Sequence, residues 1–335
     1  MLLTACGGDD DATEKPKASG GTTSEQKSDL KVGLAYDIGG RGDQSFNDAA
    51  AKGLDQAKSD LGITANEAEA AQGEPESAKE ERLRLLAQNG FNPVIAVGFA
   101  YSGALKKVAA EFPDTNFAII DDAGATGPNI ANLVFAEEQG SFLVGAAAAL
   151  KSKTGKVGFV GGVNVPLIKK FEAGYTAGAK AVKADIDVQV KYLTQPPDFS
   201  GFGDPAKGKT AAEGMYQDGA DVVYQAAGGS GGGVFEAAKA ANAMAIGVDS
   251  DQALTAAEGV RDVIITSMLK KVDVAVFDFI KSVSEDNFKA GTVVYDLKAD
   301  GVGYATTGGK IDDITTQLDE FKGKIISGEI KVPTT

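Results

Sequence analysis

The chain has 335 residues and a formal net charge of −14, and it contains no histidine. Nucleic acids and anionic membrane surfaces attract clustered lysine and arginine, so a chain this acidic is not expected to bind either of them directly. The lack of histidine excludes Ser–His and Cys–His catalysis and histidine-ligated zinc, which favours a binding protein over an enzyme.

The single cysteine, Cys6, lies near the start of the chain in the sequence MLLTACG. This segment resembles the lipobox of bacterial lipoproteins, with residues 1–5 as the remnant of a signal peptide. The resemblance implies that Cys6 is acylated and anchors the protein on the extracytoplasmic face of the cell membrane; a free cysteine in a disordered N-terminus is the alternative. Residues 7–28 contain no aromatic or branched aliphatic side chain. Residues 6–29 are therefore predicted to be a lipidated cysteine followed by a flexible tether.

From Leu30 onward, short apolar segments alternate with segments of helical spacing. Strands are predicted at 31–36, 63–70, 93–98, 116–121 and 132–136, and helices at 47–60, 75–89 and 101–112. Strands that alternate with helices are typical of a parallel sheet covered on both faces.

The same alternation begins again near residue 139. Strands are predicted at 156–160, 188–193, 221–225, 245–249, 262–266 and 292–297, and helices at 139–151, 166–184, 210–219, 232–243, 268–283 and 311–326. Because the length also corresponds to about two domains of ordinary size, the chain is predicted to form two α/β lobes.

Polar or glycine-rich residues follow the predicted strands in both lobes. They lie at 37–47, 98–99 and 121–122 in the first lobe, and at 161–162, 228–233 and 249–251 in the second. Since the carboxyl ends of parallel strands meet at one edge of a sheet, two such edges facing one another would enclose a cleft. The segment 37–47 also has a simpler interpretation, a turn in which Ser45 or Asn47 caps the following helix.

Two of these segments suggest other chemistry. Asp249-Ser250-Asp251 has hard oxygen ligands for a metal, but the downstream Gly and Glu of a calcium loop are missing. The glycines at 228–233 open a helix as in a phosphate cradle, but no Gly-Lys-Ser/Thr follows them. Close approach of the backbone to a neutral ligand needs the same glycines, and no metal or cofactor is expected.

Phe46, Phe99 and Phe171 lie in or beside these polar segments. Aromatic faces next to carboxylates suit a ligand with a flat apolar face and hydroxyl groups at its edge, although each ring could be an ordinary core residue. Lys270 and Lys271 are predicted in the first turn of the helix at 268–283, where one would point into the cleft and the other to solvent.

Several segments, taken in order, resemble the basic membrane protein family. They are 37–47, 120–121, 138–145, 171–175, 219–224, 247–252 and 266–273. Members of this family are lipoprotein substrate-binding components of ABC transporters and include bacterial purine nucleoside receptors. The resemblance implies a type I periplasmic-binding-protein fold, with two Rossmann-like lobes and parallel sheets joined by a three-segment hinge. It places 30–137 plus 253–289 in the N-terminal lobe and 138–252 plus 290–335 in the C-terminal lobe.

The same resemblance implies that a purine nucleoside (adenosine, guanosine or inosine) binds between the lobes, with aromatic rings stacked on the base. Together with Phe99, the expected ligand-binding residues are Asp37, Asp43, Ser45, Phe46, Asn47, Asp121, Phe171, Gly229, Asp249 and Lys270. Lys270 is preferred to Lys271 because it follows Ser-Met-Leu, the place of the family's lysine. The protein is expected to be a monomer that serves an ABC permease and its ATPase.

Three alternatives remain at this point. A type I receptor for a sugar or a signalling molecule would need fewer aromatic faces and more polar groups. A nucleoside hydrolase would use Asp37, Asp43 and Asp121 as a calcium or base cluster, and would release products. A surface adhesin would have no small-molecule ligand.

Overall fold

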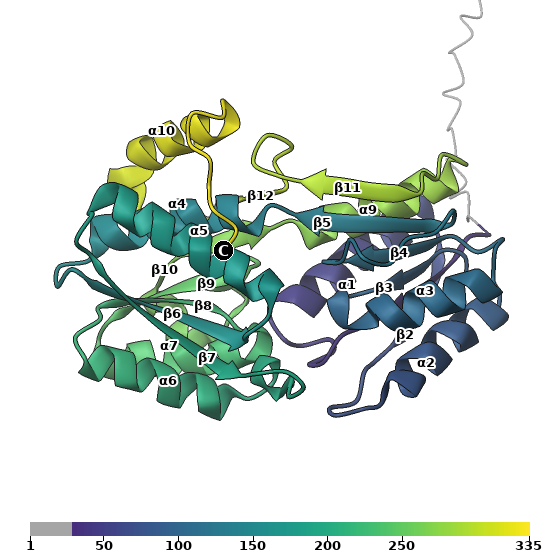
Figure 1. The fold of residues 1–335 in the computed structure, drawn as a ribbon, viewed down its shortest axis with the longest axis horizontal. Helices are drawn as coiled ribbons and strands as arrows, with labels where there is room; N and C mark the ends of the chain where they lie inside the picture. The colour runs from purple at the N-terminus through teal and green to yellow at the C-terminus, as the bar shows by residue number, and fades with distance from the viewer. Residues whose placement is uncertain (1–28) are drawn as a thin grey trace, which may run out of the picture.

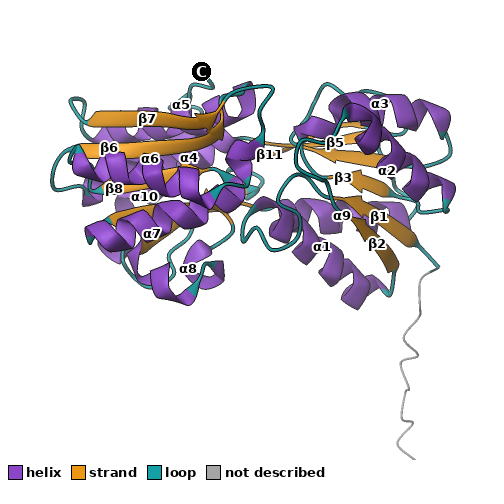
Figure 2. Cartoon of the chain, turned by 90° about the horizontal axis from the view of Figure 1, so that it is seen from below, coloured by secondary structure: helices purple, strands orange, loops and turns teal. Residues whose placement is uncertain are grey.

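The computed structural model describes residues 29–335, which form two lobes side by side, each built on one six-stranded sheet (Figure 1). The predicted lipidation site at Cys6 and the predicted tether at 7–28 lie outside the described residues. Helices lie on both faces of each sheet (Figure 2). Two α/β lobes with largely parallel sheets confirm the fold class expected from the sequence. Within residues 29–335, no helix has the length and apolarity needed to cross a membrane.

The sheet of the first lobe has the strand order β11-β5-β4-β3-β1-β2, and all of its neighbouring strands are parallel. Its strands are β1 (Lys31–Ala35), β2 (Thr64–Ala68), β3 (Val94–Ala96), β4 (Phe117–Ile120), β5 (Ile130–Phe135) and β11 (Gly291–Tyr295). The central strands β1, β3 and β4 are almost wholly buried. Their short apolar runs are what a sheet covered on both faces requires.

Four helices cover this sheet: α1 (Phe46–Leu61), α2 (Glu76–Gln88), α3 (Ser102–Glu111) and α9 (Val272–Ser284). Helices α1 and α9 pack closely because Gly53 has no side chain. A Cβ atom at Gly53 would lie 2.3 Å from the carbonyl oxygen of Asp273. Helix α9 therefore belongs to the first lobe, although it follows a strand of the second.

The sheet of the second lobe has the order β12-β10-β9-β8-β6-β7, with β12 antiparallel to β10 and the other pairs parallel. Its strands are β6 (Lys156–Val163), β7 (Asp187–Thr194), β8 (Val222–Ala226), β9 (Met244–Asp249), β10 (Ile264–Lys270) and β12 (Val302–Tyr304). Its α-helices are α4 (Glu137–Lys151), α5 (Pro166–Val182), α6 (Pro205–Gln217), α7 (Gly231–Ala241), α8 (Gln252–Thr255) and α10 (Thr315–Ile326).

The chain passes between the lobes from β5 to α4, from β10 to α9 and from β11 to β12. The expected lobe boundaries are wrong for two strands. Strand β10, expected in the first lobe within 253–289, pairs with β9 of the second. Strand β11, expected in the second lobe within 290–335, pairs with β5 of the first. Both are short strands, and nothing in their sequences indicates which of the two sheets they join.

Three predicted helices begin four or five residues from the expected start, among them α10, which begins at Thr315 instead of Ile311. The helix predicted from Met268 begins at Val272, because 268–270 continue β10 and pair with both β9 and β12. Helix α6 begins at Pro205 instead of Thr210. There the Asp204 carboxylate accepts a hydrogen bond from the Lys207 amide at 3.1 Å, so an ordinary N-cap starts the helix within the predicted loop.

Candidate ligand site between the two lobes

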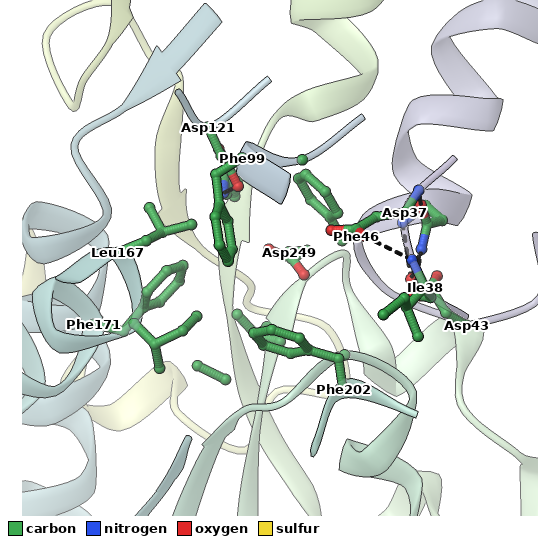
Figure 3. A pocket seen from close by; sticks show the side chains of 17 residues that line it. Asp37, Ile38, Asp43, Phe46, Phe99, Asp121, Leu167, Phe171, Phe202 and Asp249 are labelled. Atoms are coloured by element: carbon green, nitrogen blue, oxygen red, sulfur yellow. Dashed lines mark hydrogen bonds and ion pairs between the residues drawn. The ribbon is translucent and has the colours of Figure 1, made fainter. Parts of the chain in front are cut away.

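The carboxyl edges of the two sheets face one another across a small cavity of about 60 Å³ (Figure 3). Side chains from both lobes line it. The first lobe supplies Asp37, Ile38, Asp43, Phe46, Asn47, Gly98, Phe99 and Asp121, and the second supplies Leu167, Ile168, Phe171, Phe202, Ala226, Gly228, Val248, Asp249 and Lys270.

The loop between β1 and α1 is organised by Asp43. One oxygen of its carboxylate accepts from the amides of Ser45 (2.9 Å) and Asp48 (3.1 Å), and the other accepts from the amide of Asn47 (2.9 Å). Asp43 thus satisfies the free amides at the start of α1, and the expected capping by Ser45 or Asn47 is wrong. A carboxylate with two oxygens can accept from several amides at once, and its charge is favourable at a helix N-terminus.

Asn47 instead fixes the start of the loop. Its Oδ1 accepts from the Asp37 amide at 3.0 Å, and its Nδ2 donates to the Ile38 carbonyl at 3.3 Å. Asp37 is thereby held with its carboxylate against Gly98, where a Cβ atom would lie 2.4 Å from Asp37 Oδ2. Gly98 also has φ of 100°, so only glycine fits there without strain. Burial raises the pKa of Asp37 to about 6.

Lys270 is the one cation among the cavity-lining residues, and its side chain is 2% exposed. Its Nζ donates to Asp121 Oδ2 at 2.5 Å and lies 3.4 Å from Glu137 Oε1. Three rings have centroids within 5.6 Å of the ammonium group: those of Phe46, Phe135 and Phe171. Burial alone would lower the pKa of Lys270, but the neighbouring carboxylates, Asp121 foremost, outweigh it and raise the pKa above its ordinary value. The lysine is therefore charged at neutral pH.

Asp121 and Asp249 occupy matching places in the two lobes. Asp121 directly follows β4 and Asp249 ends β9, and both have left-handed backbones, with φ of 66° and 62°. Such conformations are uncommon for residues other than glycine, and they concentrate at functional sites. Burial, against the opposing effect of Lys270, raises the pKa of Asp121 to about 7, and burial raises that of Asp249 as well. One oxygen of Asp121, Oδ1, is buried without a hydrogen-bond partner.

Four phenylalanine rings surround the same space as Asp249: Phe46, Phe99, Phe171 and Phe202 (Figure 3). Phe171 lies on α5 and is 3% exposed, whereas Phe202 comes from the loop that precedes α6. Phe99 continues the aromatic surface toward Phe199 of the second lobe, with ring centroids 6.0 Å apart. The cavity therefore joins flat apolar faces to carboxylates and one ammonium group.

Most of the expected ligand-binding residues line the cavity; Ser45 and Gly229 do not. Ser45 is fully buried and its hydroxyl donates to Asp249 Oδ2 at 2.6 Å, while Gly228 lines the cavity in place of its neighbour. Of the two candidate lysines, Lys270 faces the cavity from the end of β10, not from a helix. Lys271 forms an ion pair with Asp300 at the surface.

Several lining residues were not expected from the sequence. Ile38, Leu167, Ile168 and Val248 are apolar, and nothing in the sequence distinguishes them from core residues. Phe202 lies in the Pro/Gly-rich segment 195–209, where two aromatics among glycines and prolines, Phe199 and Phe202, were the available signal. In residues 29–335, no three His, Cys, Asp or Glu side chains are grouped to hold a metal ion, so Asp37, Asp43 and Asp121 form no calcium cluster here.

Comparison with known proteins places these features in context. The sequence model of a family described as "ABC transporter substrate-binding protein PnrA-like" matches residues 30–335. The ABC transporter nucleoside-binding protein BmpA of Lactococcus lactis subsp. cremoris is 35% identical, over 94% of this chain and 92% of that protein. An uncharacterized lipoprotein of Pyrococcus horikoshii is also 35% identical, over 88% of this chain and 77% of that protein.

Among solved structures, an ABC transporter solute-binding protein from Aeropyrum pernix K1 is similar to this chain. It superposes with a TM-score of 0.80 at 32% sequence identity, over 91% of this chain and 94% of that one.

Proposed function

The chain belongs to the PnrA-like family of ABC transporter substrate-binding proteins, and we propose that it binds a purine nucleoside in the cavity between its lobes. One observation carries this proposal: aromatic rings from both lobes line the cavity, with carboxylates beside them. Phe46 and Phe99 come from the first lobe, and Phe171 and Phe202 from the second. A purine offers two flat apolar faces to such rings, and its edge carries polar groups.

The carboxylates and Lys270 supply partners for the polar edges of the ligand. Asp37 Oδ1 is bonded by the Ile38 amide, and no hydrogen bond is made to its Oδ2 in the described part of the chain. Asp121 Oδ1 is likewise unpartnered and buried next to Lys270. Ribose hydroxyls and base N–H groups are donors that such oxygens need, since an unsatisfied buried acceptor is costly.

The charge of the site favours a nucleoside over a nucleotide. Four aspartates line the cavity, and the ammonium of Lys270 is already paired with Asp121 and Glu137. A phosphate group would bring negative charge next to buried carboxylates with no free cation to receive it. We therefore expect adenosine, guanosine or inosine to bind far more tightly than their monophosphates.

The cellular role that we propose is delivery to a membrane permease and its ATPase by a monomeric lipoprotein, not catalysis. The relative from Pyrococcus horikoshii is called a lipoprotein, and Cys6 lies in a lipobox-like sequence. Acylation of Cys6 would hold the protein on the extracytoplasmic face of the cell membrane. In the source cells, a Cys6→Ser variant should appear in the soluble fraction while the unaltered protein stays with the membranes.

Calorimetric titration of the purified chain with adenosine, guanosine, inosine, ribose, arabinose and adenosine monophosphate tests the ligand. At least one purine nucleoside should bind with sub-micromolar affinity, about 8 kcal/mol or more. Chromatography should recover the nucleoside unchanged. If a pentose binds and no purine nucleoside does, the protein is a sugar receptor, and if free base appears, it is a hydrolase. If no small molecule binds, the nucleoside proposal is wrong.

A further inference from the structure

Two neighbouring residues of the first lobe, Gln44 and Ser45, bond directly to the second lobe, at the last residue of β9 and in the segment that follows it. The Ser45 hydroxyl donates to Asp249 Oδ2 at 2.6 Å, and Gln252 Nε2 donates to the Gln44 carbonyl at 2.9 Å. We call these four residues the clasp. Both hydrogen bonds of the clasp connect protein atoms of the two lobes, and neither involves a ligand. They lie beside the cavity, and Gln44, Ser45 and Gln252 do not line it.

The second-lobe half of the clasp is oriented before it meets the first lobe. Gln252 is 2% exposed, and its Oε1 accepts from the Val248 amide at 2.9 Å and from Gln225 Nε2 at 2.7 Å. The Gln225 amide is itself fixed, since its Oε1 accepts from the Ala227 amide at 3.0 Å. Because Gln252 Oε1 already accepts these two hydrogen bonds, the side chain must direct its donor, Nε2, toward the opposite lobe.

The first-lobe half is held in an uncommon backbone conformation. Gln44 has φ of 56°, in the left-handed region that non-glycine residues seldom adopt. Its amide donates to Asp48 Oδ2 at 2.9 Å, while its carbonyl faces Gln252. Strain of this kind persists only where surrounding contacts determine it, and the contacts here are those of the loop and of the clasp.

We propose that the clasp sets how long a bound ligand stays in the cavity. Ser45 and Gln252 are positioning residues in this scheme: they hold the lobes together without touching the ligand. A ligand enters and leaves through an open form, so weakening a bond that exists only in the closed form speeds departure more than it changes entry. This inference rests on the proposed function, because the ligand used to test it is a purine nucleoside.

Three single substitutions distinguish the effect of losing a clasp bond from the effect of a general loss of stability. Ser45→Ala removes one bond between the lobes. Gln252→Glu keeps the acceptor for Val248 and Gln225 but replaces the donor that faces the Gln44 carbonyl by an oxygen. Ser267→Ala is the matched control: Ser267 is a fully buried serine whose hydroxyl accepts from the Gln252 amide at 3.1 Å within the second lobe.

Stopped-flow binding of the tightest purine nucleoside gives both rate constants for each variant. Ser45→Ala and Gln252→Glu should raise the dissociation rate constant about tenfold or more and change the association rate constant less than about threefold. Ser267→Ala should lower the melting temperature yet leave the dissociation rate constant within about twofold of wild type. Equal dissociation rate constants in all three variants and the wild type would overturn the proposal.

A measurement without ligand distinguishes a failure of the clasp proposal from a failure of the proposed function. Dyes attached at Gln88→Cys on α2 and Ala206→Cys on α6, in a full chain with Cys6→Ser, report the separation of the lobes by energy transfer. Ser45→Ala and Gln252→Glu should shift the transfer toward the open form in the absence of ligand, and Ser267→Ala should not. If wild type binds no nucleoside, the proposed function fails, and this measurement alone decides whether the clasp holds the lobes. An unchanged transfer in both clasp variants would contradict it.

Discussion

The two lobes line one cavity with different chemistry. The first supplies three of the four lining aspartates, and the second supplies most of the apolar wall. Most polar groups of the first lobe are held by bonds within the loop between β1 and α1, such as those of Asp43 and Asn47, whereas Asp121 follows β4 and bonds to Lys270. The second-lobe side chains come from separate segments that the sheet brings together, among them Phe171 on α5 and Phe202 before α6. We infer that the first lobe orients the ligand and that the second supplies apolar contact when the lobes close.

Lys270 and Asp249 are the exceptions to this division, as the two charged lining residues of the second lobe, and removal of Lys270 should have the largest effect. Lys270→Met would leave Asp121 buried without its cation, and Glu137 with Lys170 as its remaining partner. Breaking a buried ion pair in this way costs about 3–5 kcal/mol. We expect nucleoside binding to become undetectable by calorimetry and the melting temperature to fall.

Lys271→Met is the matched control, because its partner Asp300 is a surface residue. Exposed pairs contribute about 0–1 kcal/mol, so this variant should bind as wild type does. If Lys270→Met bound within a few fold of wild type, the ion pairs at the centre of the cavity would be irrelevant to the ligand.

Phe171 represents the apolar contribution of the second lobe, and its replacement should have an intermediate effect. Phe171→Leu keeps most of the apolar volume but removes the aromatic face, which is worth about 1 kcal/mol when stacked on another ring. Calorimetry should show nucleoside affinity falling by about fivefold, with little change in how the variant discriminates against a monophosphate, since that depends on charge.

Phe159→Leu controls for the loss of a ring from the core of the same lobe. Phe159 is fully buried among Tyr175, Tyr192 and Tyr224 and does not line the cavity. It should lower stability without weakening binding. Equal loss of affinity in the two variants would mean that Phe171 acts through the fold and not through contact with the ligand.

The same contrast explains what could be predicted from the sequence. The first-lobe side of the site is mostly one continuous segment, 37–47, whose place at the edge of the sheet was predictable from a strand followed by a helix. The choice of Asp37, Asp43, Phe46 and Asn47 within it came from the family resemblance. Asp121 was predictable because it directly follows a strand of the same parallel sheet. Local sequence is a sufficient guide when the residues of a site are adjacent in the chain.

On the second-lobe side, sequence was a weaker guide. Leu167 and Ile168 were missed because apolar side chains in a cavity and in a core have the same pattern. Lys270 was predicted for the site, but on a helix. The apolar residues before it fit the period of a helix as well as that of a strand, and it is their pairing with β9 and β12 that makes them a strand. The wrong lobe assignments of β10 and β11 have the same origin, since tertiary contacts decide which strands pair.

Asp37 tests the polar contribution of the first lobe, with the smallest expected effect, through its dependence on pH. Burial raises its pKa to about 6 in the folded chain, above the ordinary value of 3.8. A carboxyl with a raised folded pKa stabilises the fold most at low pH, and this contribution is lost as pH rises through about 6. An asparagine at this position does not ionise, so its contribution to stability does not change with pH. The stability of Asp37→Asn relative to wild type should therefore increase by about 1 kcal/mol between pH 5 and pH 7.5, measured by urea unfolding of the ligand-free chain.

Nucleoside binding by the same variant should change in the opposite sense. If Asp37 accepts hydrogen bonds from the ligand as a carboxylate, Asp37→Asn loses most affinity at pH 7.5, where the wild-type group is ionised, and least at pH 5, where it is protonated. Calorimetry at both values measures this difference. A loss of affinity that is equal at the two pH values would show that the first lobe orients its ligand without the charge of Asp37. In that case the chemical division between the lobes would rest on Asp121 alone, the remaining first-lobe carboxylate with an unpartnered oxygen.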